Sequence, residues 1–296
     1  MTHAVDLDAV GRTALVTAAM RAAETSRPDA IHEDPYAALL AGETGPALLA
    51  ELLAATSTAP AWHAPGAASP GPVGSTSPAV NAIRTRFFDD YLRAAAREPG
   101  LRQIVVVGAG MDSRAYRMRW PAGIRYFEVD RQPVLDYKRE RLSAQTPRAD
   151  RRTVPQDLLS PSWPDALTAA GYDPGQPSAW LLEGVLCYLP EDGVHRVLAQ
   201  LAELTTPASQ VAADVVSAAA LTVPARRAQR AVFASWGCPW LFGCDDPEAL
   251  FDRHGFTSRA TQPGEPAAEF GRWPAPVPPR DLPDVYRVFL LTGHRR

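Results

Sequence analysis

Short apolar runs alternate with amphipathic segments from about residue 80 to the end of the chain. Residues 103–107 (QIVVV) form a short apolar run, which is typical of a strand buried on both faces of a parallel sheet. Residues 191–204 place aliphatic side chains three and four positions apart, so we expect a helix with one apolar face. Because strand and helix signals alternate, the chain predicts an α/β fold with a doubly wound parallel sheet. Similar patterns predict further strands at 124–130, 152–157, 178–184, 210–216 and 284–293, and helices at 80–97, 133–142, 161–171 and 245–256.

The N-terminal part follows a different pattern. Residues 1–58 are rich in Ala and Leu and predict helices interrupted at prolines. Residues 59–79 consist mainly of Pro, Gly, Ser and Ala, a composition that cannot form regular structure and that is typical of lids or mobile linkers. We therefore expect an N-terminal helical cap with a lid loop over 1–79, and a ligand-binding domain over 80–296 with an insertion near 217–245.

Composition and charge narrow the classes of partner. The chain has 46% hydrophobic residues, a net charge of −3 and no basic block, so we expect neither a nucleic acid nor a membrane as partner. It has no run of about 20 apolar residues, and Asp6 and Asp8 stand where a signal peptide would carry positive charge. The three cysteines form no C-x-x-C pair, and the six histidines have no metal-ligand spacing. We expect a cytoplasmic protein that binds a small molecule and no metal; its oligomeric state stays open.

A glycine turn follows the first expected strand. Residues 107–113 read VGAGMDS, and Asp130 ends the second strand twenty residues past Gly110, which is the outline of a nucleotide-binding unit. Ligands of such sheets bind beyond the carboxyl ends of the strands, where the residues that follow each strand converge. The residues in this position are Gly108, Gly110, Asp112, Asp130, Asp157 and Glu183.

This strand-end set is acidic, which bears on the kind of ligand. A dinucleotide brings a pyrophosphate, which is disfavoured beside carboxylates. The dinucleotide fingerprint also needs a small residue at its sixth position, where this chain has Ser113 preceded by Asp112. A ligand that carries positive charge and no phosphate fits better, and S-adenosylmethionine is such a ligand. An NAD-dependent oxidoreductase is the disfavoured alternative.

From about Asp34 to Asp214 the chain resembles the leucine carboxyl methyltransferase-like family, whose bacterial members are S-adenosylmethionine-dependent O-methyltransferases. The resemblance implies a Rossmann-like class I methyltransferase with a mostly parallel seven-stranded sheet, and S-adenosylmethionine as the cofactor of the 80–296 domain. The matching motifs occur in order: RTRFFDDYL (84–92), VVVGAGMDSRAYRM (105–118), YFEVDRQPVLDYKRERL (126–142), PQDL (155–158) and LLEGVLCYLPEDGVHRVL (181–198).

The resemblance also implies roles for individual residues. Arg84 would meet the methionine carboxylate, Gly108 the methionine part and Asp130 the ribose. Gly110 and Asp112 belong to the same glycine turn and are expected at the cofactor. The remaining assignments are Asp157 and Leu158 at the adenine, and Glu183 at the methionine amino group or the pocket beside it.

The bases that the sequence offers indicate whether the methyl acceptor is a carboxylate or a phenol. A carboxylate, with a pKa of about 4, is ionised at pH 7 and needs no general base for in-line transfer, whereas a phenol, with a pKa of about 10, does. His195 alone among the histidines comes near the expected strand ends, and it lies in an amphipathic helix where a core or surface role is expected. We therefore expect a carboxylate acceptor, oriented by Tyr188 and Arg86.

An aromatic and apolar cluster between the fifth strand and the next helix either covers the acceptor or belongs to the core. If it lines the site, the substrate is a hydrophobic or aromatic small acid. The alternatives are methylation of a phenol or hydroxyl group in secondary metabolism, an NAD-dependent oxidoreductase, and a non-catalytic cofactor-binding protein. The cluster consists of Val232, Phe233, Trp236, Trp240, Leu241 and Phe242.

Overall fold

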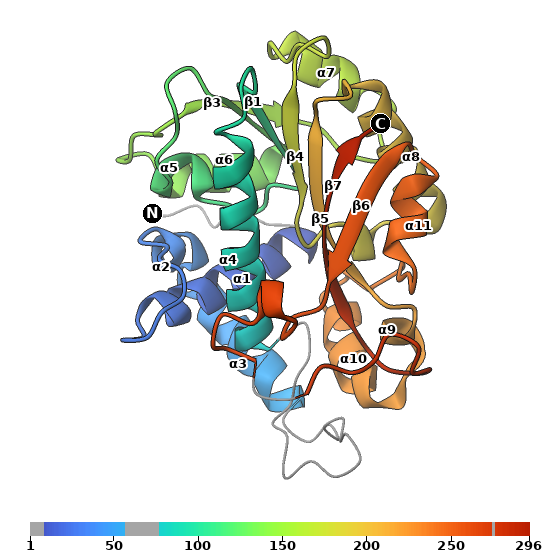
Figure 1. Cartoon of the computed structure of the whole chain (residues 1–296). Coiled ribbons are helices and arrows are strands. Elements are labelled where there is room, and N and C mark those ends of the chain that lie inside the picture. The colour runs from blue at the N-terminus through green and yellow to red at the C-terminus, as the bar shows by residue number, and fades with distance from the viewer. Residues whose placement is uncertain (1–8, 57–76, 274–275) are drawn as a thin grey trace.

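The computed structural model, which describes residues 9–56, 77–273 and 276–296, is built on a seven-stranded sheet (Figure 1). The strand order is β3-β2-β1-β4-β5-β7-β6. Strands β1 to β5 pair in parallel, while β7 runs antiparallel to β5 and β6. This confirms the expected mostly parallel, seven-stranded sheet. The strands are β1 Gln103–Val107, β2 Arg125–Asp130, β3 Asp150–Pro155, β4 Ser178–Leu182, β5 Gln210–Val216, β6 Phe256–Thr261 and β7 Val288–Arg295.

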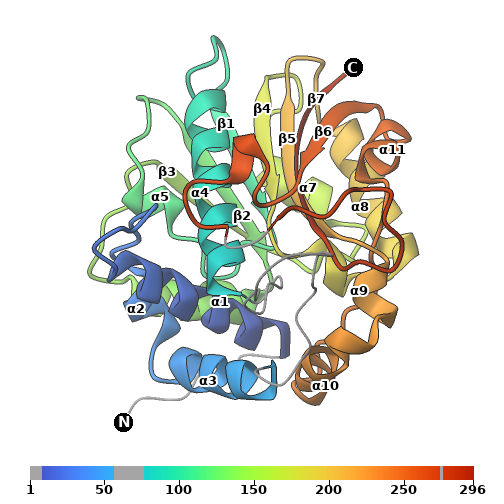
Figure 2. The ribbon, with the colours of Figure 1, turned by 60° about the horizontal axis from the view of Figure 1, so that its bottom comes forward.

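Helices lie on both faces of this sheet and across one of its edges (Figures 1 and 2). Short 3-10 turns at Leu186–Tyr188, Pro224–Arg226 and Pro266–Ala268 connect some of them. The helices are α1 Ala9–Thr25, α2 Ala37–Ala41, α3 Thr44–Thr56, α4 Pro78–Ala95, α5 Arg114–Arg117, α6 Gln132–Arg141, α7 Trp163–Ala169, α8 Glu191–Glu203, α9 Ala219–Thr222, α10 Arg227–Ser235 and α11 Pro247–Asp252.

Each face of the sheet has its own apolar core, because successive side chains of a strand point to opposite faces. Ile104 and Val106 of β1 belong to the core that includes α4, where Phe88 is fully buried. Val105 and Val107 belong to the opposite core, with α7, α8 and α11. Strands buried on both sides explain why the runs at β1 and β5 are almost wholly apolar.

The C-terminal edge of the sheet differs from the expectation. The predicted helix over 245–256 ends at Asp252, and Gly255, with a φ of +80°, leads the chain directly into β6. The sequence pattern missed β6 because this edge strand pairs with β7 alone and exposes several of its polar side chains. The closing strand begins at Val288, four residues later than predicted.

The N-terminal helices cover the carboxyl edge of the parallel strands. Helices α1 and α3 lie across this edge (Figure 2), and α10 from the predicted insertion packs against α3. The predicted lid over 59–79 lies outside the described residues as far as 76; its last residues, 77–79, cap and begin α4. None of the described helices is long and apolar enough to cross a membrane. The three cysteines are free thiols.

His32 lies in the loop between α1 and α2 and is buried. Its side chain is 6% exposed, and neither ring nitrogen has a hydrogen-bond partner among the described residues. Burial, reinforced by the nearby Arg117 guanidinium, lowers the pKa of His32 from 6.5 to about 4. The unfolded chain therefore takes up a proton at higher pH than the folded chain. The stability that the neutral His32 side chain contributes to the folded state is complete above pH 6.5 and is lost as the pH falls towards 4.

Replacing His32 with Leu is expected to reduce the loss of stability between pH 7 and pH 5 by about 2 kcal/mol, because the variant has no imidazole to protonate on unfolding. Urea unfolding at the two pH values measures this difference. His294→Leu, which removes an exposed imidazole of β7, serves as the control and should keep the wild-type pH dependence. An unchanged pH dependence in His32→Leu would contradict the assignment.

Candidate active site

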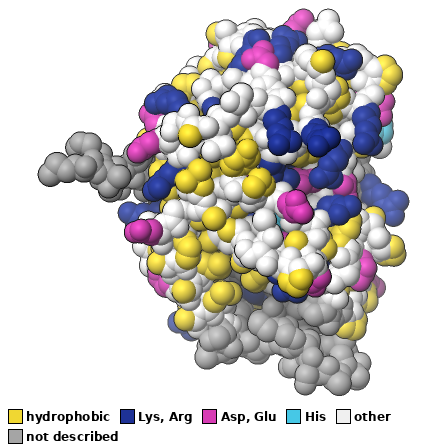
Figure 3. Space-filling view, turned by 90° about the vertical axis from the view of Figure 1, so that its left-hand side faces the viewer, with side chains coloured by type: hydrophobic (Ala, Val, Ile, Leu, Met, Phe, Trp, Pro, Cys, Tyr) yellow, Lys and Arg dark blue, Asp and Glu magenta, His cyan; other side chains and the backbone are white. Residues whose placement is uncertain are grey.

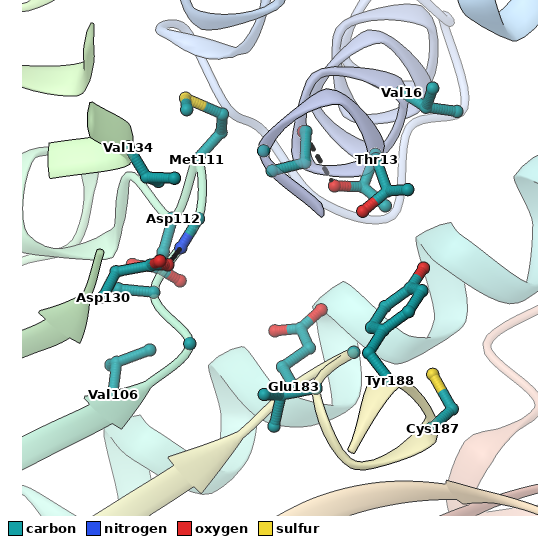
Figure 4. Close-up of a pocket in the computed structure, with 18 of the residues that line it drawn as sticks. Thr13, Val16, Val106, Met111, Asp112, Asp130, Val134, Glu183, Cys187 and Tyr188 are labelled. Carbon is teal, nitrogen blue, oxygen red and sulfur yellow. Dashed lines mark hydrogen bonds between the residues drawn. The ribbon is translucent and has the colours of Figure 1, made fainter. Parts of the chain in front are cut away.

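A cavity of about 270 Å³ opens at the carboxyl ends of β1, β2, β4 and β5, beneath α1 (Figure 4). Its position at the switch point between β1 and β4 is where doubly wound sheets bind their ligands. Nine of the ten residues proposed from the sequence line it, and Arg86 does not. The nine are Arg84, Gly108, Gly110, Asp112, Asp130, Asp157, Leu158, Glu183 and Tyr188.

The turn after β1 requires both of its glycines. Gly108 has a φ of +67°, and a Cβ there would lie 2.7 Å from Cγ2 of Val185. Gly110 has a φ of +41°, and a Cβ there would lie 3.0 Å from Cβ of Ala14 in α1. A side chain at either position would therefore be strained and crowded. The bare backbone lets the turn, the loop after β4 and α1 approach one another around the cavity.

Asp130, at the end of β2, is held by the backbone on either side. The N–H of Gly110 donates to Oδ2 at 2.6 Å, and the N–H of Arg131 donates to Oδ1 at 2.7 Å. Burial raises the pKa of this carboxyl even though both N–H groups act to lower it. Figure 4 shows the Asp130 side chain beside the glycine turn at the cavity. Its position and its remaining lone pairs suit it to accept hydrogen bonds from ligand hydroxyls.

Arg114 of α5 is buried among three carboxylates. Its Nε donates to Oδ1 of Asp89 at 2.7 Å, and its Nη1 lies 2.5 Å from Oδ2 of Asp112 and 2.8 Å from Oε2 of Glu183. The side chain is 3% exposed. Burial acts to lower the pKa of Arg114, but the three carboxylates raise it well above its usual value. One guanidinium thus joins α4, the glycine turn and the end of β4.

Arg84 continues this network towards β5. Its Nε lies 3.1 Å from Oε1 of Glu183, and its Nη1 donates to Oδ2 of Asp214 at 3.0 Å. Burial acts to raise the pKa of Glu183, but Arg114 and Arg84 together lower it. For Asp214 burial prevails, and its pKa is raised. Gly184 adds a backbone N–H to Asp214 at 2.5 Å, so the loop after β4 is fixed to β5.

The network also reaches the N-terminal helices. Both η nitrogens of Arg117 donate to Asp89 at 2.6 Å. Arg21 of α1 donates to Asp34 at 2.9 Å and to the carbonyl of Met111 in the glycine turn at 2.6 Å. Helix α1 is therefore bonded directly to the turn that it covers.

These ion pairs correct the expectation of an acidic rim. Asp112 and Glu183 are not unpaired charges, because both contact Arg114. Five Arg and five Asp or Glu residues line the cavity in the part of the chain that the structure describes, so it is balanced in formal charge. Asp157 is exposed at the rim, where it accepts a hydrogen bond from the N–H of Leu159, while Leu158 is buried.

The other side of the cavity is aromatic. Tyr188 projects towards Thr13 of α1 (Figure 4), and its hydroxyl interacts with the Thr13 side chain. Burial raises the pKa of both Tyr188 and the neighbouring Cys187 far above neutrality, so both stay protonated at pH 7. No His or Lys is present among the described residues that line the cavity. This side therefore offers hydrogen-bond donors and apolar surface.

The predicted aromatic cluster divides between this wall and the core. Phe233 and Trp240 line the cavity and stack with ring centroids 5.4 Å apart. Val232 and Trp236 pack in a core cluster that includes residues of α1 and α3. The other two members lie elsewhere: Phe242 belongs to the core on the face of the sheet covered by α7, α8 and α11, and Leu241 is 49% exposed.

Residues 14–202 match the leucine carboxyl methyltransferase family. The chain belongs to this family. The resemblance noted in the sequence motifs is thereby confirmed.

A sequence relative agrees with this membership. A protein of Mycobacterium avium (strain 104), named as an S-adenosyl-L-methionine-dependent methyltransferase, is 44% identical over 212 residues. The match covers 70% of this chain and 64% of that protein, so it spans less than two thirds of the relative's length.

Two solved structures share the fold of this family member at low identity. A DUF574 family protein from Streptomyces avermitilis MA-4680 has a TM-score of 0.57 and 14% identity, covering 96% of this chain and 97% of that one. A structure from Thermobifida fusca YX, named as a methyltransferase, has a TM-score of 0.55 and 22% identity, covering 88% and 93%. At these identities the likeness concerns the fold alone.

This geometry does not support the catalytic role expected for Arg86. Residues two positions apart on a helix point in nearly opposite directions, so Arg84 faces the cavity and Arg86 faces away. Arg86 pairs with Asp90 at 2.7 Å, donates to the carbonyl of Ile31 and lies over the Phe270 ring. We therefore no longer assign it a catalytic role. His195 also lies outside the cavity, within hydrogen-bond distance of His254.

Several members of the ion-pair network were not proposed from the sequence, Asp214, Arg114 and Asp89 among them. Asp214 lies within β5, two residues before its end at Val216, so a rule that takes the residues following each strand could not find it. Arg114 stands in the SRAYRM motif next to Asp112, and Asp89 stands in RTRFFDDYL, but nothing in their spacing shows that they pair. No group of three or more metal-ligating side chains occurs within the described ranges.

Arg114→Met is expected to lower the free energy of unfolding by about 3–5 kcal/mol, because it leaves Asp112 without its ion-pair partner and removes one of the cations beside Asp89 and Glu183. Urea unfolding at pH 7 measures the loss. Arg86→Met is the matched control: it removes an arginine of α4 whose ion pair is 40% exposed, so we expect a loss below about 1 kcal/mol. Equal losses in the two variants would show that the buried network adds no stability of its own.

Proposed function

We propose that this protein is an S-adenosylmethionine-dependent O-methyltransferase that methylates a carboxylate of a hydrophobic or aromatic small molecule. The observation that carries the proposal is the cavity of this methyltransferase family member. One side of this cavity is lined by the glycine turn, Asp130 and the paired charges. The other side is an aromatic wall with no His or Lys among the described residues. Family membership removes the reason for the NAD-dependent alternative.

The cavity suits S-adenosylmethionine in charge. This cofactor carries one carboxylate and two cationic groups, and the lining offers five residues of each sign. Arg84 and Arg114 are balanced by the carboxylates beside them, so the lining has no excess of positive charge to neutralise the two phosphates of a dinucleotide.

Within this proposal, each side chain has a task set by its position. Asp130 accepts hydrogen bonds from the ribose hydroxyls, Arg84 binds the methionine carboxylate, and Glu183 binds the amino group. When bound, the cofactor supplies an electrophilic methyl group on a sulfonium. The ion pairs fix these side chains before the ligand arrives, so little reorganisation is needed on binding.

The acceptor side favours a nucleophile that is already ionised. Cys187 and Tyr188 keep their protons at pH 7, and the described lining residues include no His or Lys to remove one. A carboxylate needs no base, and the Tyr188 hydroxyl can donate a hydrogen bond that orients it. Phe233 and Trp240 provide apolar surface for the rest of the molecule and exclude water from the transfer.

The pH dependence of turnover tests the acceptor class. Matched pairs of aromatic acids and phenols are offered, and S-adenosylhomocysteine release is measured from pH 6 to 9. For an acid we expect kcat/KM to change less than about threefold over this range, because a group of pKa about 4 stays ionised. The product should be a methyl ester that alkali hydrolyses. Transfer to phenols only, with a rate that rises about tenfold per pH unit, would overturn the carboxylate assignment.

Asp130→Asn tests the cofactor site separately. It preserves the shape of the side chain and removes its charge, so S-adenosylhomocysteine affinity should fall by about 1–3 kcal/mol, roughly 5- to 150-fold. Calorimetry measures the affinity, and the melting temperature checks that the variant is folded. Asp136→Asn, on the partly exposed side of α6, is the control and should bind as the wild type does. Unchanged affinity in Asp130→Asn would mean that the ribose lies elsewhere.

A further inference from the structure

A second hollow borders the same ion network, and Arg117 lines both this hollow and the cofactor cavity. Its volume is about 810 Å³, and it is enclosed by the C-terminal end of α4, the loop after α5, the loop before β3 and the loop that follows α1. Arginine side chains stand close together on the face shown in Figure 3. Five arginines line the hollow, against the single acidic residue Glu33: Arg93, Arg97, Arg117, Arg119 and Arg148.

Three of these arginines have no carboxylate partner in the described part of the chain. Arg93 and Arg117 both pair with Asp89, and Arg93 pairs with Asp90 as well. The three others, Arg97, Arg119 and Arg148, are exposed and have no described carboxylate oxygen within the 4.0 Å of an ion pair. The hollow therefore holds an excess of positive charge in a protein whose net charge is −3.

Helix electrostatics do not account for this excess. Basic residues at a helix C-terminus are favoured by the helix dipole, which explains Arg93 and Arg97 at the end of α4. Arg119 and Arg148 lie on loops and have no such support. Like charges that face one hollow repel each other, and the repulsion is relieved when an anion binds between them.

We propose that this arginine hollow is a binding site for a small, multiply charged oxyanion such as an oligophosphate. Guanidinium groups bind the oxygens of phosphates and carboxylates through paired N–H donors, so three of them suit a ligand with two or more negative charges. Trp120, which lines the same hollow and is partly exposed, offers a ring face to an organic part of the ligand. The overall negative charge of the protein disfavours a long nucleic acid as the occupant.

The test is calorimetric titration of the full chain with inorganic pyrophosphate at low ionic strength. We expect saturable binding at one site with a dissociation constant below 1 mM, on the scale of about 4 kcal/mol or more, and a loss of at least tenfold in the variant Arg97→Ala/Arg119→Ala/Arg148→Ala. Titrations with citrate and with ADP show whether a polycarboxylate or a nucleotide binds more tightly than inorganic pyrophosphate.

A second triple variant controls for charge alone. Arg139→Ala/Arg196→Ala/Arg296→Ala removes three exposed arginines that each pair with a neighbouring carboxylate, so it should bind pyrophosphate as the wild type does. Affinity for S-adenosylhomocysteine should be the same in both triple variants, which separates this site from the cofactor cavity. The proposal is overturned by absent binding, by equal loss in both variants, by equal affinity for sulfate, or by tighter binding of a single-stranded oligonucleotide.

Discussion

The burial of Arg114 is the constraint on which the candidate site depends. An arginine cannot discard its proton in a protein, so the cost of removing its charge from water must be offset by carboxylates placed around it. Asp89, Asp112 and Glu183 meet this need from three separate segments. The segments must therefore converge at one point, and that point borders the cavity. A structural requirement of the buried cation thus fixes the relative positions of the groups that face a ligand.

This arrangement changes the electrostatic account of the site. An unpaired acidic rim would select a ligand by net charge, whereas a lining with equal numbers of Arg and acidic residues selects by the position of each charge. Charges already held by ion pairs cannot rotate to suit any ligand that arrives, which favours one arrangement of positive and negative groups. A zwitterionic cofactor with separated charges matches such a site better than an anion of similar size.

The sequence predicted most of the parallel sheet, because strands buried on both faces must be apolar throughout, and β1 and β5 have the bounds expected for them. It missed β6, where an edge position relaxes that requirement. Strand ends located Asp130 and Glu183, since topology alone brings strand ends together. Pairing of Arg114 with Asp89 could not be predicted, because it depends on how helix α4 packs on the sheet and not on any local spacing.

The cavity has a charged side and an aromatic side, and the way they are connected limits its chemistry. Helix α1 contributes Thr13 opposite Tyr188 on the aromatic side, while Arg21 bonds the same helix to the glycine turn on the charged side. Because this helix spans both sides, its packing sets the distance between them. The buried hydroxyl and thiol on the aromatic side keep their protons, so under the proposed function the site would accelerate methyl transfer chiefly by position and exclusion of water. Chemistry that begins with proton removal would have to use one of the carboxylates, because the described lining supplies no His or Lys.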